Sequence, residues 1–96
     1  MKFKFLAAAL AAGALCAPAH AQTEIQWWHA MGGALGEALN GVADKFNASQ
    51  KDYKIVATYK GQYPESLTAA IAAFRAGNAP HLLQVFEVGT ATLMAA

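Results

Sequence analysis

The sequence predicts an α/β fold in which a parallel sheet is built in the order strand, helix, strand, helix, strand. Three short runs rich in β-branched and aromatic residues mark the strands, at 24–28, 53–59 and 82–86. Between them lie two segments in which apolar residues recur at helical spacing. Because alternating strands and helices normally pair their strands in parallel, both helices are expected to be crossover connections.

Gly32-Gly33 separates the first predicted strand from the first predicted helix, which ends in the polar residues 47–50. Backbone N–H groups at such a glycine pair suit an anion. Glycines also serve ordinary turns, so the pair alone is weak evidence for a site. The apolar residues of the helix fall on one face and are expected to face the core: Leu35, Leu39, Val42, Ala43 and Phe46.

The second predicted strand leads through a turn at 60–63 into the second helix. Pro64 suits the first position of that helix, and Gly77 is the expected cap at its carboxyl end. Pro80 then prevents the helix from continuing. The residues expected to face inward are Leu67, Ala70, Ile71 and Phe74.

The third predicted strand, 82–86, is followed by a turn at 88–90 and a further helix that starts near Ala91. Parallel sheets are normally covered on both faces, which two helices do poorly. The last residues, 90–96, are apolar and prone to form a helix. We therefore expect this chain to be part of a longer protein.

Composition excludes several classes of function. The 96 residues are 56% hydrophobic and 14% charged, with a formal charge of +1 and one cysteine. A charge near zero gives no electrostatic footprint for nucleic acid. One cysteine supports neither an internal disulfide framework nor a multi-cysteine metal site. The apolar content is too high for a disordered tail, and the length permits one domain at most.

Residues 1–21 have the pattern of a secretion signal. Two lysines, Lys2 and Lys4, precede the uncharged apolar segment 5–17, and Ala19-His20-Ala21 supplies the small residues that a signal peptidase reads. A transmembrane helix needs roughly 20 apolar residues in succession, and Pro18 interrupts this run. The prediction is an export signal cleaved after Ala21.

A lipid anchor on Cys16 is the alternative fate of this segment, although Leu15 stands where such signals favour a small residue. Cleavage after Ala21 removes that cysteine and both lysines. The remaining 75 residues carry five basic and six acidic side chains, a formal charge of −1. A domain this short buries only about 60% of its unfolded surface, which again favours a piece of something larger.

Trp27-Trp28-His29 lies where the first predicted strand ends. Side chains alternate along a strand, so one tryptophan should face the core and the other should face outward. Trp28 and His29 are therefore candidates for lining a ligand cleft, with packing against another element as the structural alternative. His81 lies far along the chain from His29, which makes a metal site improbable.

Tyr63 and Glu87 each lie just beyond the carboxyl end of a predicted strand, where open α/β sheets bind ligands. Each also has a purely structural interpretation. Tyr63 is suited to a hydrophobic staple beside Pro64. Glu87 is suited to a solvated loop or to capping the helix that starts near Thr90. The pattern alone leaves both alternatives open.

Several stretches resemble the extracellular solute-binding proteins of ABC importers, and together they cover residues 24–96. The segment after the third strand and the glycine–tyrosine turn are the narrower signals, and they resemble the members that bind sn-glycerol 3-phosphate. The stretches are Glu24-Ile25-Gln26-Trp27-Trp28-His29, Thr58-Tyr59-Lys60-Gly61-Gln62-Tyr63, Ala72-Ala73-Phe74-Arg75-Ala76-Gly77-Asn78-Ala79-Pro80 and Leu83-Gln84-Val85-Phe86-Glu87-Val88-Gly89-Thr90.

The resemblance implies a periplasmic-binding-protein-like fold of type II, with two α/β lobes joined by a hinge. Residues 22–96 would then be an incomplete amino-terminal lobe, with the second lobe absent. The family's ligand-contacting tyrosine and glutamate correspond to Tyr63 and Glu87. The family's other ligand contacts lie downstream of residue 96, and Arg75 is a poor substitute because it lies in the last turn of a helix.

The function that the resemblance implies is that of a periplasmic, non-enzymatic receptor. It would capture sn-glycerol 3-phosphate or a glycerophosphodiester and deliver it to a membrane permease and its ATPase, without a metal or cofactor. This 96-residue chain by itself is expected to bind little ligand.

Three alternatives come from other classes. One is a receptor for sugars or oligosaccharides, in which Trp27 or Trp28 would stack on a pyranose ring. Another is a secreted hydrolase of glycerophosphodiesters, for which the sequence offers no spaced set of nucleophile, base and metal ligands. The last is a truncated product without a function.

Overall fold

The computed structural model describes residues 21–96, and the sequence-predicted export signal lies almost wholly outside them. The elements follow the order β1 (Thr23–His29), α1 (Gly33–Ser49), β2 (Tyr53–Tyr59), α2 (Tyr63–Arg75) and β3 (Leu82–Leu83). A short 3₁₀ turn, η1 (Glu87–Gly89), then leads into α3 (Thr90–Ala95). This β-α-β-α-β order confirms the fold class predicted from the sequence, and α3 begins where a further helix was expected.

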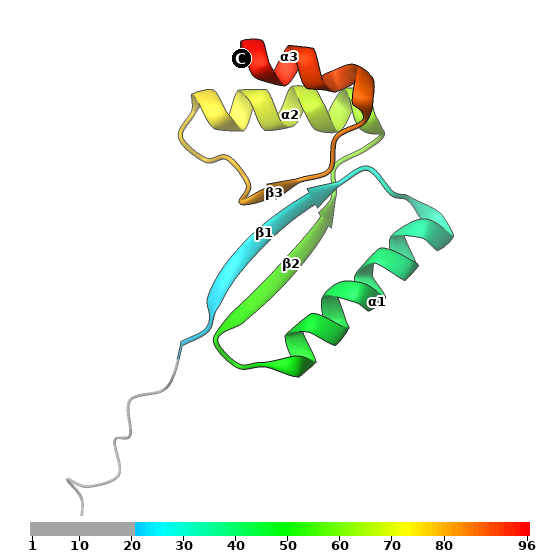
Figure 1. Cartoon of the computed structure of the whole chain (residues 1–96), viewed down its shortest axis with the longest axis vertical. Helices are drawn as coiled ribbons and strands as arrows, with labels where there is room; N and C mark the ends of the chain where they lie inside the picture. The colour runs from blue at the N-terminus through cyan, green and yellow to red at the C-terminus, as the bar shows by residue number, and fades with distance from the viewer. Residues whose placement is uncertain (1–20) are drawn as a thin grey trace, which may run out of the picture.

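The three strands form one parallel sheet in the order β2-β1-β3. β1 pairs with β2 along its whole length, from Thr23 opposite Tyr53 to His29 opposite Tyr59. The chain thus moves across the sheet in one direction from β1 to β2 and in the opposite direction from β2 to β3. Right-handed crossovers then place α1 and α2 on opposite faces, which is the arrangement seen in Figure 1.

α1 docks on its face of the sheet through small residues and one side-chain amide. Gly36 and Ala43 are its buried residues. Asn47 extends the contact, because its Nδ2 donates to the carbonyl of Ile55 (2.9 Å) and its Oδ1 accepts from the Ile55 N–H (2.7 Å). α1 therefore lies close against β2, with its last turn fixed to the strand backbone.

α2 has the capped end that the sequence predicts. Its first helical residue is Tyr63, one position before the predicted Pro64, and Gly77 adopts a positive φ of 79° after the last turn. The Gly77 N–H donates to the Phe74 carbonyl (3.1 Å), and the Asn78 N–H donates to the Ala73 carbonyl (2.7 Å). These two bonds form a Schellman motif, which only glycine adopts without strain.

The third strand is shorter than predicted, because only Leu82 and Leu83 pair with β1. Leu83 lies opposite Trp28, so Gln84 is level with His29 and the residues after Gln84 run beyond the end of β1. The Gln84 N–H still donates to the Trp28 carbonyl (2.9 Å). The N–H of Ala30, just after β1, donates to the Gln84 side chain instead of to its backbone carbonyl (3.0 Å). A side-chain hydrogen bond thus replaces the next backbone hydrogen bond of the sheet. The strand prediction for residues 84–86 is wrong.

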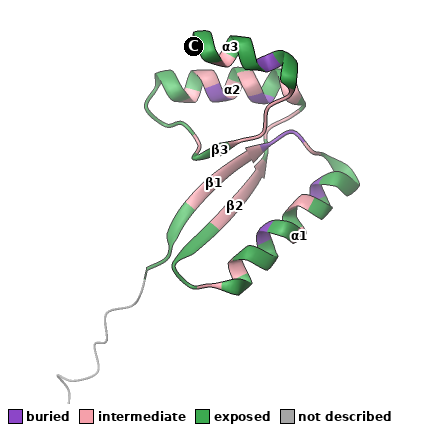
Figure 2. Cartoon of the chain, viewed as in Figure 1, coloured by how far each residue is buried: buried purple, intermediate pink, exposed green. Residues whose placement is uncertain are grey.

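The predicted inward faces of both helices are only partly buried. Leu35, Val42 and Phe74 are 64%, 61% and 62% exposed, and in Figure 2 much of the outer surface of α1 and α2 is exposed. The helices touch the sheet through a stripe of small residues beside the large apolar ones: Gly36 and Ala43 on α1, and Ser66 and Ala70 on α2. Within residues 21–96, no helix is long and apolar enough to cross a bilayer.

Candidate ligand-binding site

The topology puts the favoured ligand position at the carboxyl end of β1. β1 and β3 are neighbours, yet the chain leaves β1 towards α1 on one face and leaves β3 towards α3 beside α2 on the other. The loops at the two strand ends therefore diverge at the topological switch point, where open α/β sheets have their binding crevice. We define the carboxyl edge as residues 28–32, 59–63 and 84–87, which follow or end the three strands.

Tyr63 crosses the carboxyl edge. It follows β2, on one side of β1, but its ring stacks on Phe86, which follows β3 on the other side. The ring centroids are 4.9 Å apart and the planes are inclined by 27°, a geometry that stabilises offset aromatic pairs. This stack fixes the half-buried phenol in the crevice region and differs from the predicted staple beside Pro64.

Glu87 comes directly after Phe86 and begins the turn η1. Its side chain is exposed. Tyr63 stacks on the residue that precedes Glu87, so both predicted residues lie at the carboxyl edge, one after β2 and the other after β3. They supply a hydrogen-bond donor and an acceptor to this edge.

Trp28 lies on the α2 face of the sheet, because it pairs with Leu83, which lines a cavity under α2. The ring is half-buried, and the Nζ atom of Lys60 lies 4.1 Å from its centroid. This is a cation–π contact between the end of β1 and the first residue after β2. Trp28 was predicted from the sequence as a candidate site residue, whereas Lys60 was not, because only the strand register shows that the two are neighbours.

His29 is 2% exposed and lies on the α1 face. Its Nδ1 accepts a hydrogen bond from the Met31 N–H (3.2 Å), and its ring packs against those of Trp27 and Tyr59. Loss of water around the ring lowers the pKa of His29, so the imidazole stays neutral. These contacts make His29 part of the support of the edge, on the opposite face from Trp28.

A cavity of about 260 Å³ opens on the α1 face beside His29. Neither Tyr63 nor Glu87 nor Trp28 lines it. The residues around it come from the end of β1, the start of α1 and β2: His29, Met31, Gly32, Gly33, Gly36, Glu37, Asn40, Ala57 and Tyr59. The structure therefore separates His29 from the other candidate site residues, which lie towards the α2 face.

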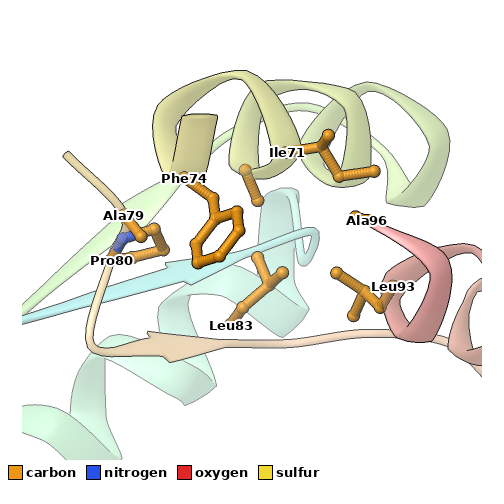
Figure 3. Close-up of a pocket in the computed structure, with 8 residues that line it drawn as sticks. Ile71, Phe74, Ala79, Pro80, Leu83, Leu93 and Ala96 are labelled. Carbon is orange, nitrogen blue, oxygen red and sulfur yellow. The ribbon is translucent and has the colours of Figure 1, made fainter. Parts of the chain in front are cut away.

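A second cavity, of about 250 Å³, lies between α2, β3 and α3 (Figure 3). In Figure 3 the side chains of Phe74, Leu83 and Leu93 converge on it, and Pro80 closes one side. Every side chain that lines it is apolar, so it offers no side-chain hydrogen bond to a polar solute. We assign it to the packing of the α2 face and not to binding of a charged ligand.

Two further polar side chains hold the segment around β3 against β1, and neither contact was predicted from the sequence. Gln84 binds the Ala30 N–H through its side chain, as described above. His81 exchanges hydrogen bonds with Gln26: its N–H donates to the Gln26 carbonyl (3.0 Å), and its Nδ1 accepts from the Gln26 N–H (2.9 Å). These two hydrogen bonds hold the start of β3 against β1. Within residues 21–96, no three potential metal-ligating side chains come together.

No family model matches the chain. Comparison with curated proteins finds the sn-glycerol-3-phosphate-binding periplasmic protein UgpB of Escherichia coli, 58% identical over 93 residues, which are 96% of this chain. The protein of the same name from Shigella flexneri is 58% identical over 92 residues, or 95% of this chain. The chain spans about a fifth (21%) of the length of these relatives. Along almost all of its own length, the chain is thus similar to the sn-glycerol-3-phosphate-binding periplasmic proteins, and the resemblance predicted from its residues is confirmed.

Proposed function

We propose that this chain is part of the substrate-binding component of an ABC importer that captures sn-glycerol 3-phosphate, or a glycerophosphodiester, in the periplasm. The observation that supports the proposal is that Tyr63 and Glu87 both lie at the carboxyl edge, where open α/β sheets bind ligands. The 58% identity to proteins named for this ligand supports it. Capture would be followed by delivery to the membrane permease and its ATPase.

The charges decide which part of the ligand each side chain takes. A phosphate monoester carries a charge of about −1.5 to −2 near neutral pH, so the Glu87 carboxylate would repel it. Glu87 instead accepts hydrogen bonds from glycerol hydroxyls. Tyr63 donates its phenolic O–H to a glycerol or phosphate oxygen. The aromatic stack of Tyr63 on Phe86 supports the role of the phenol, because it holds the ring at the carboxyl edge.

The proposed role is binding, without chemistry on the ligand. The carboxyl edge combines a phenol, a carboxylate, a lysine and an indole, and its buried histidine lies on the other face. This set can recognise a polar solute. Export to the periplasm would use the signal predicted at residues 1–21.

The described carboxyl edge leaves a ligand open to solvent on one side. Its relatives are about five times longer, and the carboxyl edge described here is open to solvent at Glu87. A small ligand is held tightly only when most of its surface is enclosed. We therefore expect the 96-residue chain alone to bind sn-glycerol 3-phosphate weakly or not at all.

The structure gives less support to a receptor for sugars. Stacking on a pyranose ring needs an open aromatic face, but the Lys60 ammonium lies over the Trp28 ring. Trp27 lies on the α1 face, edge-on to His29 at 6.3 Å. Neither tryptophan offers a bare ring to the crevice at the switch point.

A chimera tests the proposal directly. The matching fifth of the Escherichia coli relative is replaced by this chain, and the purified protein is titrated by calorimetry with sn-glycerol 3-phosphate, glycerophosphocholine and maltose. We expect binding of the first or second ligand and none of maltose. Tyr63→Phe should weaken binding about tenfold, as expected for one lost hydrogen bond to a charged group.

Binding of maltose in place of the phosphate compounds would overturn the proposed ligand. Unchanged affinity in the Tyr63→Phe chimera would overturn the assignment of the phenol. Tight binding by the 96-residue chain alone would refute the expectation that it supplies only part of the cleft.

A further inference from the structure

We propose that Lys60 is an anion-binding residue of this site, which holds the phosphate end of the ligand on the β2 side of the crevice. This inference rests on the proposed function and goes beyond it by fixing the direction in which the ligand lies. The phosphate would lie over Lys60 and Trp28, and the glycerol hydroxyls would point to Glu87 on the β3 side.

The backbone fixes Lys60 at the carboxyl edge. It is the first residue after β2, and its N–H donates to the carbonyl of His29, the last residue of β1 (2.9 Å). Its side chain reaches from the end of β2 to the Trp28 ring on β1, where Nζ lies 4.1 Å from the centroid. Trp28 is on the same face of the sheet as α2, which begins with Tyr63. The ammonium is therefore held near the phenol that the proposed function assigns to the ligand.

The charge on this ammonium is not neutralised within residues 21–96. Its partner there is the indole ring, and no carboxylate forms a salt bridge with it. An aromatic face attracts a cation through its quadrupole but leaves the net charge in place. The Trp28 ring thus orients a free positive charge without cancelling it, as an anion site requires.

The other cations of the described residues lie far from this edge. In a parallel α/β sheet the helices run back against the strands, so their carboxyl ends lie at the amino edge of the sheet. Lys45 lies in the carboxyl-terminal half of α1, Arg75 in the last turn of α2, and Lys54 at the start of β2. Lys51 lies in the turn between α1 and β2, at the same amino edge. Among the five cations of residues 21–96, Lys60 alone lies at the carboxyl edge.

The two charged side chains of the site lie on opposite sides of β1. Lys60 follows β2 and Glu87 comes after β3, and the strand order is β2-β1-β3. Strands in a sheet are spaced by about 4.8 Å, so the two strand ends are about 10 Å apart. A solute with a phosphate at one end and hydroxyls at the other matches this arrangement of a cation and an anion.

The experiment compares lysine variants in the same chimera with the Escherichia coli relative. Lys60→Gln should lower the affinity for sn-glycerol 3-phosphate about tenfold or more, measured by titration calorimetry. Lys54→Gln removes a charge from the other end of the same strand and should leave the affinity unchanged, which controls for net charge. Lys60→Arg keeps the charge and should retain most of the affinity.

Salt dependence separates a charge contact from a structural role. Affinity of the unchanged chimera should fall as sodium chloride is raised, and Lys60→Gln should flatten this dependence whereas Lys54→Gln should not. Equal affinity and equal salt dependence of the Lys60→Gln and Lys54→Gln chimeras would overturn the inference while the proposed function stands. Absence of any binding by the unchanged chimera would overturn the proposed function and this inference together.

Discussion

The two faces of the sheet are built differently. On the α1 face, Gly36 and Ala43 bring the helix close, and Asn47 makes paired hydrogen bonds to the backbone of Ile55. On the α2 face, an apolar cavity of about 250 Å³ remains under the helix, and Phe74 at its margin is 62% exposed. Both faces keep a cavity of similar size, but small residues and side-chain hydrogen bonds hold the α1 face, whereas apolar side chains surround the cavity of the α2 face.

Most of the candidate ligand-binding residues lie on the α2 side of the sheet. Trp28 and Lys60 lie on the α2 face, and Tyr63 begins α2 itself, whereas the α1 face holds the buried His29. The two faces of the sheet therefore have different roles. The α1 face anchors the strands, and the α2 side presents polar and aromatic side chains at the carboxyl edge.

The largest loss of stability is expected at Gly36, where α1 lies closest to the loop that precedes it. A Cβ at Gly36 would lie 2.5 Å from the Met31 carbonyl oxygen, a distance that backbone must move to relieve. Gly36→Ala should therefore destabilise the chain by about 1–3 kcal/mol, the range for overpacking. The free energy of unfolding is measured by urea denaturation followed by circular dichroism.

Gly41 in the same helix provides the control. A Cβ there meets nothing within 4 Å, so Gly41→Ala should stabilise the helix by about 0.5–1 kcal/mol through its better helix propensity. Equal stability of the two variants would contradict the close packing of the α1 face.

The amide of Asn47 should be the next largest contributor to the α1 face. Asn47→Ala removes both hydrogen bonds to Ile55 and leaves a partly buried backbone N–H and carbonyl without these partners. A loss of about 1–3 kcal/mol in the free energy of unfolding is expected. Asn40→Ala, at an exposed position of the same helix, should cost little, and a cost equal to that of Asn47→Ala would argue against a specific anchor.

The α2 face should tolerate loss of one large apolar side chain, that of Phe74. A fully buried phenylalanine costs about 3–5 kcal/mol when truncated to alanine. Phe74 is mostly exposed, so Phe74→Ala should cost less than about 1 kcal/mol in the same denaturation experiment. A loss in the range of a buried phenylalanine would contradict the exposed position of the Phe74 side chain.

A pH effect of smaller size is expected from His29. Burial lowers its pKa in the folded chain, so below about pH 6.5 the unfolded state binds a proton that the folded state does not. Stability is therefore full above the unfolded pKa and is lost as the pH falls towards and through the lower folded pKa. In the His29→Asn variant the free energy of unfolding should depend less on pH in this window. An unchanged pH dependence would show that burial of the imidazole carries no such penalty.

Much of the fold was predictable from local patterns, and the errors have a common origin. Strand and helix periods predicted β1, α1, β2 and α2, and glycine chemistry predicted the end of α2 at Gly77. The error over residues 84–86 arose because β1 stops at His29, which local propensity does not show. Helical periodicity likewise placed Leu35 and Val42 inward, although smaller neighbours make the contact with the sheet.

The candidate site shows the same limit. Tyr63 and Glu87 were found because strand ends of a parallel sheet share one edge, a rule that needs only the element order. The pairing of Lys60 with Trp28 and of Gln84 with Ala30 depends on which strands are neighbours. His29, chosen for its position beside Trp28, lies on the opposite face because side chains alternate along a strand.

The most direct test of the account compares two carboxylates in the Escherichia coli chimera. Glu87 lies at the carboxyl edge, whereas Glu37 lines the cavity on the α1 face. Titration with sn-glycerol 3-phosphate should show at least a tenfold loss of affinity for Glu87→Gln and no change for Glu37→Gln. Loss of affinity in the Glu37→Gln chimera with none in the Glu87→Gln chimera would contradict the account, because the ligand would then lie on the face that we assign to anchoring.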